Sequence, residues 1–146
     1  MIDSSRHIKP GGWVEFQCVT GTLLSDDDSI PPDGAFRKFS NAVKSSCLLF
    51  GTPVDDPIRW KGWFEDRGFE EVTEHMIRLP CNTWPKDKRM KVLGAWEMEN
   101  LLSSLEGMVT RLFSKALGWS AEETSVFLVD VRKEIKNRNI HAWWPL

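Results

Sequence analysis

Three histidines are the side chains of this sequence best suited to move protons near neutral pH. They are His7, His75 and His141, and an imidazole normally gains or loses its proton at about pH 6.5. His141 lies in the aromatic run Ile-His-Ala-Trp-Trp-Pro, residues 140–145. We therefore take His141 as the first candidate for general acid or base catalysis. The alternative interpretation is a structural histidine held in place by hydrogen bonds.

Carboxylates that lie among tryptophans are the second group suited to acid–base chemistry. A carboxylate in apolar surroundings has a raised pKa, which allows it to donate a proton near neutral pH. Glu15, Glu97 and Glu99 each lie close to a tryptophan in the sequence. Of these, Glu97 is the second catalytic candidate.

Neither the aspartates nor the cysteines predict a metal site. The side chains of Asp26–Asp28 are consecutive, so they point in different directions, and no further carboxylate stands at chelating spacing. We interpret them as part of a solvent-exposed loop. Cys18, Cys47 and Cys81 are odd in number, widely spaced and outside any CxxC pattern. They are therefore expected to be free, buried thiols.

Composition and charge narrow the class of protein. A chain of 146 residues with 41% hydrophobic content can bury the core of a single domain. The net charge of -2 argues against nucleic-acid binding by bulk electrostatics. No apolar run reaches the roughly 20 residues of a membrane helix, and the first residues do not resemble a signal peptide. We expect a soluble, cytoplasmic protein.

Turn and strand residues organise the first half of the sequence. Pro10 and the two glycines after it force a turn. The run from Trp13 to Val19 is rich in strand formers and apolar enough to be an inner strand of a mixed or parallel sheet. Asp33 is positioned to cap the helix that follows. The predicted order is then helix, helix, strand: Ala35 to Phe50, Ile58 to Arg67, and Phe69 to Leu79.

The second half is predicted to be mainly helical. From Lys88 to Ala116, apolar residues line a broad face, which is typical of a helix buried against two neighbours. Gly94 and Gly107 interrupt it and indicate a kink or a close helix approach. The pattern Ser120–Glu123 is a capping box that begins a last helix. Residues 140–146 are predicted to form a short closing strand.

Five segments carry a resemblance to a known family. Lys9–Gln17 resembles the turn and fifth strand of class I S-adenosylmethionine (SAM) methyltransferases. The others are similar to the C-terminal half of fungal methyltransferases of secondary metabolism, the group that includes the velvet-complex regulator: Trp84–Arg89, Leu117–Glu123, Val131–Glu134 and Asn137–Pro145. The resemblance implies an α/β fold, a truncated Rossmann-like remnant of about three strands, the fifth to seventh of the class I sheet, with a large helical insertion.

The same resemblance implies one truncated domain over residues 1–146. It would comprise a sheet and helix remnant (9–80), a helical lid (84–137) and a closing strand (140–146) that slots between the two earlier strands. In the family the lid covers an apolar substrate pocket, which here would bind a small natural-product intermediate. Five residues are the candidates for lining that pocket, the alternative being ordinary core: Trp84, Trp96, Met98, Trp143 and Trp144.

A cofactor site is not expected in this sequence. A class I methyltransferase holds its cofactor at a glycine-rich turn that follows a strand and precedes a helix. Gly11 and Gly12 instead precede a strand, so no residue here matches a SAM ligand. Without a fourth strand, the edge from Trp13 to Val19 would be open and prone to pair with another chain. We expect a homodimer, or a heteromer with a fuller methyltransferase.

Three functions remain open at this stage. The first is a methyltransferase-like protein of fungal natural-product biosynthesis that lacks the SAM-binding half and works as an oligomer or as a partner subunit. The second is a cofactor-independent cyclase or isomerase that orients a reactive intermediate and supplies an acid. The third is a non-catalytic regulatory or scaffold subunit.

Overall fold

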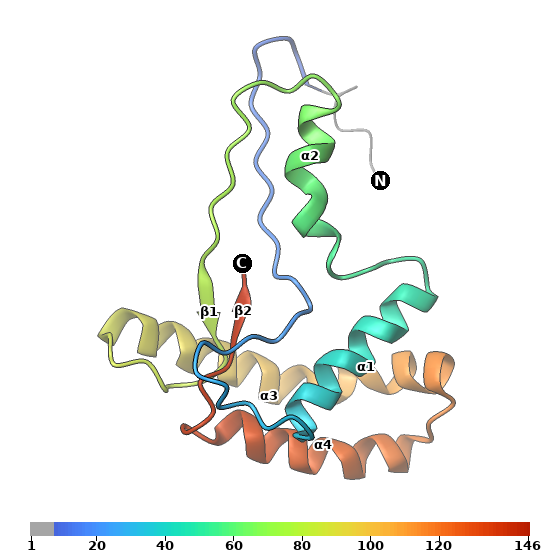
Figure 1. The fold of residues 1–146 in the computed structure, drawn as a ribbon. Coiled ribbons are helices and arrows are strands. Elements are labelled where there is room, and N and C mark those ends of the chain that lie inside the picture. Colours follow the sequence, from blue (N-terminus) through green and yellow to red (C-terminus); the bar gives the residue numbers. More distant parts are fainter. Residues whose placement is uncertain (1–7) are drawn as a thin grey trace.

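A bundle of three long helices forms the body of the molecule. The computed structural model describes residues 8–146, and within them it is a mixed α/β structure of four α-helices and a two-stranded sheet. Helices α1 (Ala35–Leu49), α3 (Lys88–Leu117) and α4 (Ala121–Lys136) each contact the other two. Figure 1 shows an arm rising from this body. We use "arm" for residues 9–19 and 56–76, which include the 3₁₀ turn Asp56–Arg59 and helix α2 (Trp60–Glu65).

The helices bury the faces that the apolar spacing predicts. In α3, residues at four-residue steps are almost inaccessible to solvent, because side chains four apart lie on one face of a helix. Residues three or four apart on α1 and α4 complete the core. Its principal members are Phe36, Phe39, Leu101, Leu105, Val109, Phe113, Leu128, Val131 and Ile135. None of the helices in residues 8–146 combines the length and apolarity that a membrane crossing needs.

The sheet consists of two short antiparallel strands. Strand β1 (Arg78–Pro80) pairs with β2 (Trp143–Pro145), with Leu79 opposite Trp144. On its other side, β2 meets residues 20–24, where Leu24 and Trp143 form an isolated antiparallel bridge. The closing strand therefore lies between β1 and residues 20–24. The expected neighbour on this second side was a strand over residues 13–19, and the bridge at Leu24 lies outside that range.

Two strand predictions are wrong in extent. Residues 13–19 form no strand, and of the range from Phe69 to Leu79 only Arg78 and Leu79 belong to a strand, β1. The run from 13 to 19 is also not an inner strand, since the exposed fraction is 83% for Trp13 and 51% for Phe16. The physical reason is the lack of pairing. A strand exists only where a neighbour supplies hydrogen bonds, and no main-chain group of the described residues pairs with residues 13–19 or 70–76.

Helix ends agree with the sequence at α4 but not at α1. The Ser120–Glu123 capping box is present, with the Glu123 N–H donating to Ser120 Oγ over 3.0 Å. Asp33 does not cap α1. Instead, the main-chain N–H groups of Ala35 and Phe36 each donate to the Glu134 carboxylate over 2.9 Å. A carboxylate brought by α4 thus satisfies the free N–H groups at the beginning of α1.

Gly94 allows α3 to approach the chain that follows β1. A Cβ at position 94 would lie 2.0 Å from the Asn82 carbonyl oxygen, so only glycine fits. Gly107 differs, because a Cβ there would meet nothing within 4 Å. The close approach expected at these glycines is therefore found at Gly94 alone.

Candidate functional site around His141

His141 is held between the end of α4 and the beginning of β2. Its main-chain N–H donates to Ser29 Oγ over 2.7 Å, and its ring Nδ1 lies 2.5 Å from Asp27 Oδ2. The half-exposed imidazole is thus joined to the 25–29 loop at two points. This loop was predicted to be merely solvent-exposed, and its contact with His141 is a feature that sequence reasoning missed.

Asp27 is prepared to act as an acceptor for His141. Ser25 Oγ donates to Asp27 Oδ1 over 2.7 Å, and the Ser29 N–H donates to the same oxygen over 3.2 Å. Ser25, Ser29 and His141, in that order, hold the pKa of the Asp27 carboxyl well below its usual range. Because a carboxylate can only accept hydrogen bonds, Nδ1 must be the donor. Nε2 is then the ring nitrogen left to exchange a proton with a substrate.

Trp84 forms one wall beside the imidazole. The two rings are tilted by 34° with centroids 5.1 Å apart. The indole Nε1–H donates to the Ala142 carbonyl oxygen over 3.0 Å, which fixes the ring against the residue next to His141. Trp84 was a predicted pocket residue, and here it contacts the first catalytic candidate.

Asn82 holds the backbone that carries His141. Its side chain is 1% exposed, and its Nδ2 donates to the carbonyl oxygens of Ile135 (3.0 Å), Asn137 (3.2 Å) and Ile140 (3.2 Å). Its Oδ1 accepts the Trp84 N–H over 2.9 Å. One amide therefore joins the end of α4 to the tryptophan wall. The sequence holds no signal for this role, because the three carbonyl partners of its Nδ2 lie more than fifty residues away.

Glu97 lies apart from this cluster. It is half-buried on α3, and burial raises the pKa of its carboxyl, while a hydrogen bond from Asn100 works in the opposite direction. Its charge also raises the pKa of the Cys81 thiol, for which burial is the larger cause. The expected raised pKa of Glu97 is confirmed in direction. Among the described contacts, however, none joins Glu97 to His141.

The remaining predicted pocket residues do not converge on one cavity. Trp144 is buried and packs edge-on against Phe36, with centroids 5.7 Å apart. Trp143 is buried beneath the Arg78 guanidinium, 5.2 Å from its ring centre. Trp96 is 72% exposed, and Met98 packs against the core cluster from its edge. Of the five, Trp84 is the one whose ring pairs with the His141 imidazole in the described residues.

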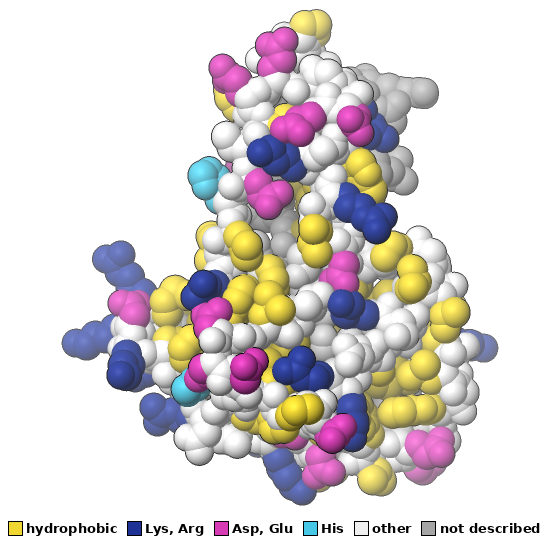
Figure 2. Space-filling model, viewed as in Figure 1, with side chains coloured by type: hydrophobic (Ala, Val, Ile, Leu, Met, Phe, Trp, Pro, Cys, Tyr) yellow, Lys and Arg dark blue, Asp and Glu magenta, His cyan; other side chains and the backbone are white. Residues whose placement is uncertain are grey.

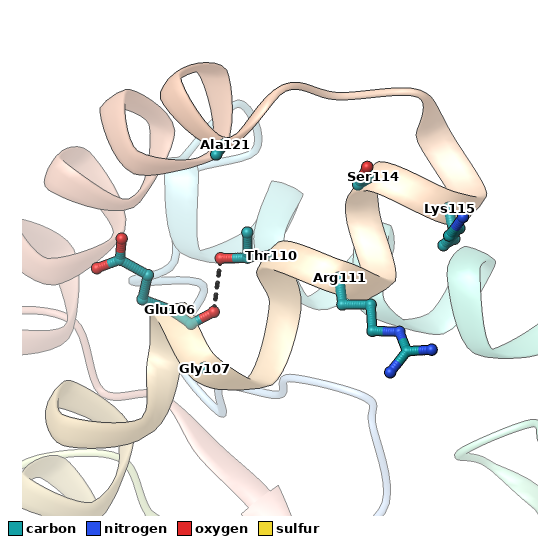
Figure 3. Close-up of a pocket in the computed structure, with 7 residues that line it drawn as sticks. All are labelled: Glu106, Gly107, Thr110, Arg111, Ser114, Lys115 and Ala121. Atoms are coloured by element: carbon teal, nitrogen blue, oxygen red, sulfur yellow. Dashed lines mark hydrogen bonds between the residues drawn. The ribbon is translucent and has the colours of Figure 1, made fainter.

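Two surface cavities lie elsewhere on the helical body. The larger, about 440 Å³, lies between α3 and the beginning of α4 and is shown in Figure 3; it is lined by Glu106, Gly107, Thr110, Arg111, Ser114, Lys115 and Ala121. In that view the Thr110 hydroxyl turns back to donate to the Glu106 carbonyl oxygen over 2.7 Å. A second cavity, about 380 Å³, lies where α1 meets α4. Neither is lined by a predicted site residue.

The other two histidines and the three cysteines take no part in the side-chain contacts of His141 within the described residues. His7 lies outside the described residues, and His75 is exposed on the arm. All three cysteines are free, as predicted. Cys81 is buried as expected, whereas Cys47 is intermediate and Cys18 is exposed. Residues 8–146 hold no group of three or more His, Cys, Asp or Glu side chains able to bind a metal ion.

Comparison with known proteins finds that the chain is similar to fungal methyltransferases. It is 32% identical over 136 residues to the methyltransferase pytC of Aspergillus terreus, covering 93% of this chain and 42% of pytC. It is 30% identical over 139 residues to the probable methyltransferase tdiE of Emericella nidulans, covering 95% and 44%. The chain is a homologue of fungal secondary-metabolism methyltransferases.

Further comparisons set the limits of this homology. The secondary metabolism regulator LAE1 of Cochliobolus heterostrophus is 31% identical over 139 residues, which cover 94% of the chain and 45% of LAE1. The chain thus spans less than half the length of these relatives. No protein-family model matches the chain, and no solved structure matches it.

Proposed function

We propose that this methyltransferase homologue forms the substrate-side portion of a methyltransferase domain of fungal natural-product biosynthesis. In this proposal, it is a Rossmann-like remnant that carries the fifth to seventh strands and the helical lid. The cofactor-binding portion is supplied by another polypeptide segment. The chain accordingly acts as an oligomer or as a partner subunit, and its ligand is a small natural-product intermediate.

The observation that carries the proposal is the exposed apolar surface next to unpaired backbone. No main-chain hydrogen bond joins residues 13–19 to any other part of the described chain, and Trp13 and Phe16 are exposed on this same segment. Soluble monomers seldom expose large apolar side chains together, and an open strand edge pairs readily. The part of the relatives that this chain does not match is a natural cover for this surface.

The test is reconstitution with the portion of tdiE that this chain does not match. Titration calorimetry would measure SAM binding to each part alone and to the mixture, with light scattering to give the mass. We expect a complex of both parts that binds SAM more tightly than either part alone. If the tdiE portion does not fold by itself, full-length tdiE replaces it. A monomer that stays separate from both, at micromolar concentration, would disprove the proposal.

A second function, cofactor-free cyclisation or isomerisation, is favoured by the contact between His141 and Asp27. A carboxylate that orients an imidazole beside an aromatic wall is an arrangement suited to general acid–base catalysis. The test is product formation from pathway intermediates without SAM, followed by mass spectrometry. His141→Gln should abolish turnover, whereas His75→Gln on the arm should not. If neither chemistry is found and a complex still forms, the chain acts as a non-catalytic scaffold or regulatory subunit.

A further inference from the structure

Arg78 is a second group suited to chemistry beside His141. Its Nη1 donates to Asp26 Oδ2 over 2.6 Å, and its guanidinium lies over the Trp143 ring, 5.2 Å from the ring centre. The Arg78 side chain is nevertheless 60% exposed. Its Nε and Nη2 donate to no acceptor among residues 8–146. The guanidinium is therefore fixed on one side and available to a ligand on the other.

The 25–29 loop brings Arg78 and His141 to one part of the surface. Asp26 pairs with Arg78 and Asp27 pairs with His141, and the Cα atoms of consecutive residues are about 3.8 Å apart. Figure 2 shows a histidine on the body and, above it, a Lys or Arg side chain, each beside acidic side chains. A permanent cation and a proton acceptor are thus held by neighbouring carboxylates. We use "Arg–His patch" for Arg78, His141, Trp84 and Trp143.

We propose that the Arg–His patch binds conjugated hydroxy-carbonyl compounds, such as hydroxyaryl ketones or enolised 1,3-dicarbonyls, and ionises their hydroxyl group. The hydroxyl oxygen of the ligand lies at His141 Nε2, and its carbonyl oxygen, several bonds away, lies at the Arg78 guanidinium. This inference rests on the function proposed above, because it names the chemical class of the small intermediate and adds Arg78 to the residues that bind it.

The proton transfer uses the residues of the patch and Asp27. The Nε2 lone pair forms a bond to the hydroxyl proton while the O–H bond breaks, and the oxygen keeps the electron pair. Asp27 accepts a hydrogen bond from Nδ1 and stabilises the imidazolium that forms. Conjugation spreads the negative charge of the ligand to its carbonyl oxygen. There the guanidinium donates charge-assisted hydrogen bonds.

The charges of the patch select a weak acid over an ionised one. With a neutral imidazole, the one positive charge of Arg78 faces the two carboxylates of Asp26 and Asp27, so an incoming anion is repelled. A neutral hydroxyl compound meets no such repulsion. Its ionisation also leaves the net charge of the complex unchanged, because the proton stays on His141.

The acidity and shape of the ligand follow from the base and the wall beside it. A phenol, with a pKa of about 10 in water, is acidic enough for an imidazole, whereas an aliphatic alcohol is not. The Trp84 ring is tilted by 34° against the imidazole and offers a flat apolar surface next to Nε2. A planar, conjugated ring system fits both conditions.

The experiment titrates the full chain with 7-hydroxycoumarin, a fluorescent phenol with a conjugated carbonyl group. Its excitation spectrum distinguishes phenol from phenolate. At a pH where the free probe is mainly neutral, we expect saturable binding with the spectrum of the phenolate. Two control probes should bind at least about tenfold more weakly: 7-methoxycoumarin, which has no proton to give, and coumarin-3-carboxylate, which is already ionised.

Substitutions separate the roles of the two residues. His141→Gln should lose the phenolate spectrum, and Arg78→Gln should weaken binding at least about tenfold. Arg78→Lys should be intermediate, because it keeps the charge but not the planar fork of donors. Arg111→Gln is the matched control, because Arg111 is exposed and lines the cavity between α3 and α4; it should bind like the wild type. Circular dichroism verifies that each variant folds.

Three outcomes would overturn the Arg–His patch. They are the lack of saturable binding, a bound probe that keeps the phenol spectrum, and equal losses in the Arg78 and Arg111 variants. The reconstitution with tdiE is scored separately. Phenolate binding without a complex keeps the patch and removes the proposed function, whereas a complex that binds SAM without phenolate binding does the reverse.

Discussion

At the scale of single residues, the chemistry of the candidate site depends on a loop that looked unremarkable in sequence. Asp27 contacts His141 only because the chain returns after 114 positions to the 25–29 loop. Ser25 and Ser29 keep the carboxylate ionised, and Trp84 limits the movement of the ring. His141 is thereby oriented, and its Nε2 is available.

Asp27→Asn tests the contribution of this carboxylate to stability. The native state holds the pKa of Asp27 below its ordinary value of about 3.9, so ionised Asp27 stabilises the fold above about pH 4. That contribution is lost as the pH falls below this value. We expect the urea midpoint of the variant to fall less than that of the wild type between about pH 5 and about pH 3.

Asp28→Asn is the matched control for the Asp27 experiment, because Asp28 is exposed in the same loop. It should keep the pH dependence of the wild type. Equal pH dependence in the Asp27 variant and the wild type would show that the contact with His141 does not persist in solution.

Asn82→Ala tests the amide that holds the site together. The substitution leaves the buried carbonyl oxygens of Ile135 and Ile140 without their donor and should cost about 2 to 3 kcal/mol of unfolding free energy. Urea denaturation measures this loss. Asn41→Ala, at an exposed position of α1, should change stability by less than about 0.5 kcal/mol. Similar losses in both variants would contradict the role of Asn82.

At the scale of elements, helix packing depends on positions whose neighbours come from elsewhere in the chain. Gly94 and Gly107 lie in the same helix and look equivalent in sequence. Glu134 looks like an ordinary exposed residue of α4, yet it caps α1. Both cases show one element determining what another can tolerate.

Gly94→Ala and Gly107→Ala should have opposite effects. Alanine at 94 would collide with the Asn82 carbonyl oxygen and should destabilise the protein by about 1 to 3 kcal/mol. Alanine at 107 meets open space and should stabilise the helix by up to about 1 kcal/mol. Thermal and urea unfolding measure both. A stabilised Gly94 variant would show that α3 does not approach the chain after β1.

Glu134→Ala should destabilise the beginning of α1. It removes the acceptor for the N–H groups of Ala35 and Phe36, which typically costs about 1 kcal/mol. Glu134→Gln, which keeps one oxygen acceptor, should lose less. Glu99→Ala is the control, because Glu99 is exposed on α3. Chemical denaturation compares the three variants, and an unchanged Glu134 variant would rule out capping by this carboxylate.

At the scale of the whole molecule, the body and the arm differ in how far their apolar side chains are buried and their main-chain groups hydrogen-bonded. The body buries its apolar faces among three helices. The arm exposes Trp13 and leaves the backbone of residues 13–19 and 70–76 without main-chain partners in the described structure. In the function proposed above, a further polypeptide segment covers this surface of the arm.

Trp13→Ala should weaken that assembly without weakening the fold. An exposed tryptophan contributes little to the stability of a monomer, but at an interface its loss costs about 2 kcal/mol, or roughly thirtyfold in Kd. Calorimetry against the tdiE portion measures the change in Kd. Trp96→Ala, at an exposed position of α3 off the arm, should bind like the wild type. Equal effects of both substitutions would remove the arm from the interface.

The sequence by itself determined the helices and their ends where these depend on near neighbours. Helical hydrogen bonds close within four residues, so apolar spacing predicted α1, α3 and α4, and the Ser120–Glu123 box predicted the beginning of α4. The resemblance carried by short motifs was confirmed by the homologues. The pairing of the closing strand with the segment that ends at Leu79 was also predicted, whereas its second neighbour is Leu24 and not residues 13–19.

Only the tertiary structure decided the strand lengths, the cap on α1 and the partners of His141. A strand requires hydrogen bonds from another segment, and residues 13–19 lack them even though their composition favours a strand. Glu134 and Asp27 contact residues that lie 99 and 114 positions away in the sequence. Interactions of that range arise from packing, because local sequence carries no information about which distant groups the fold will bring together.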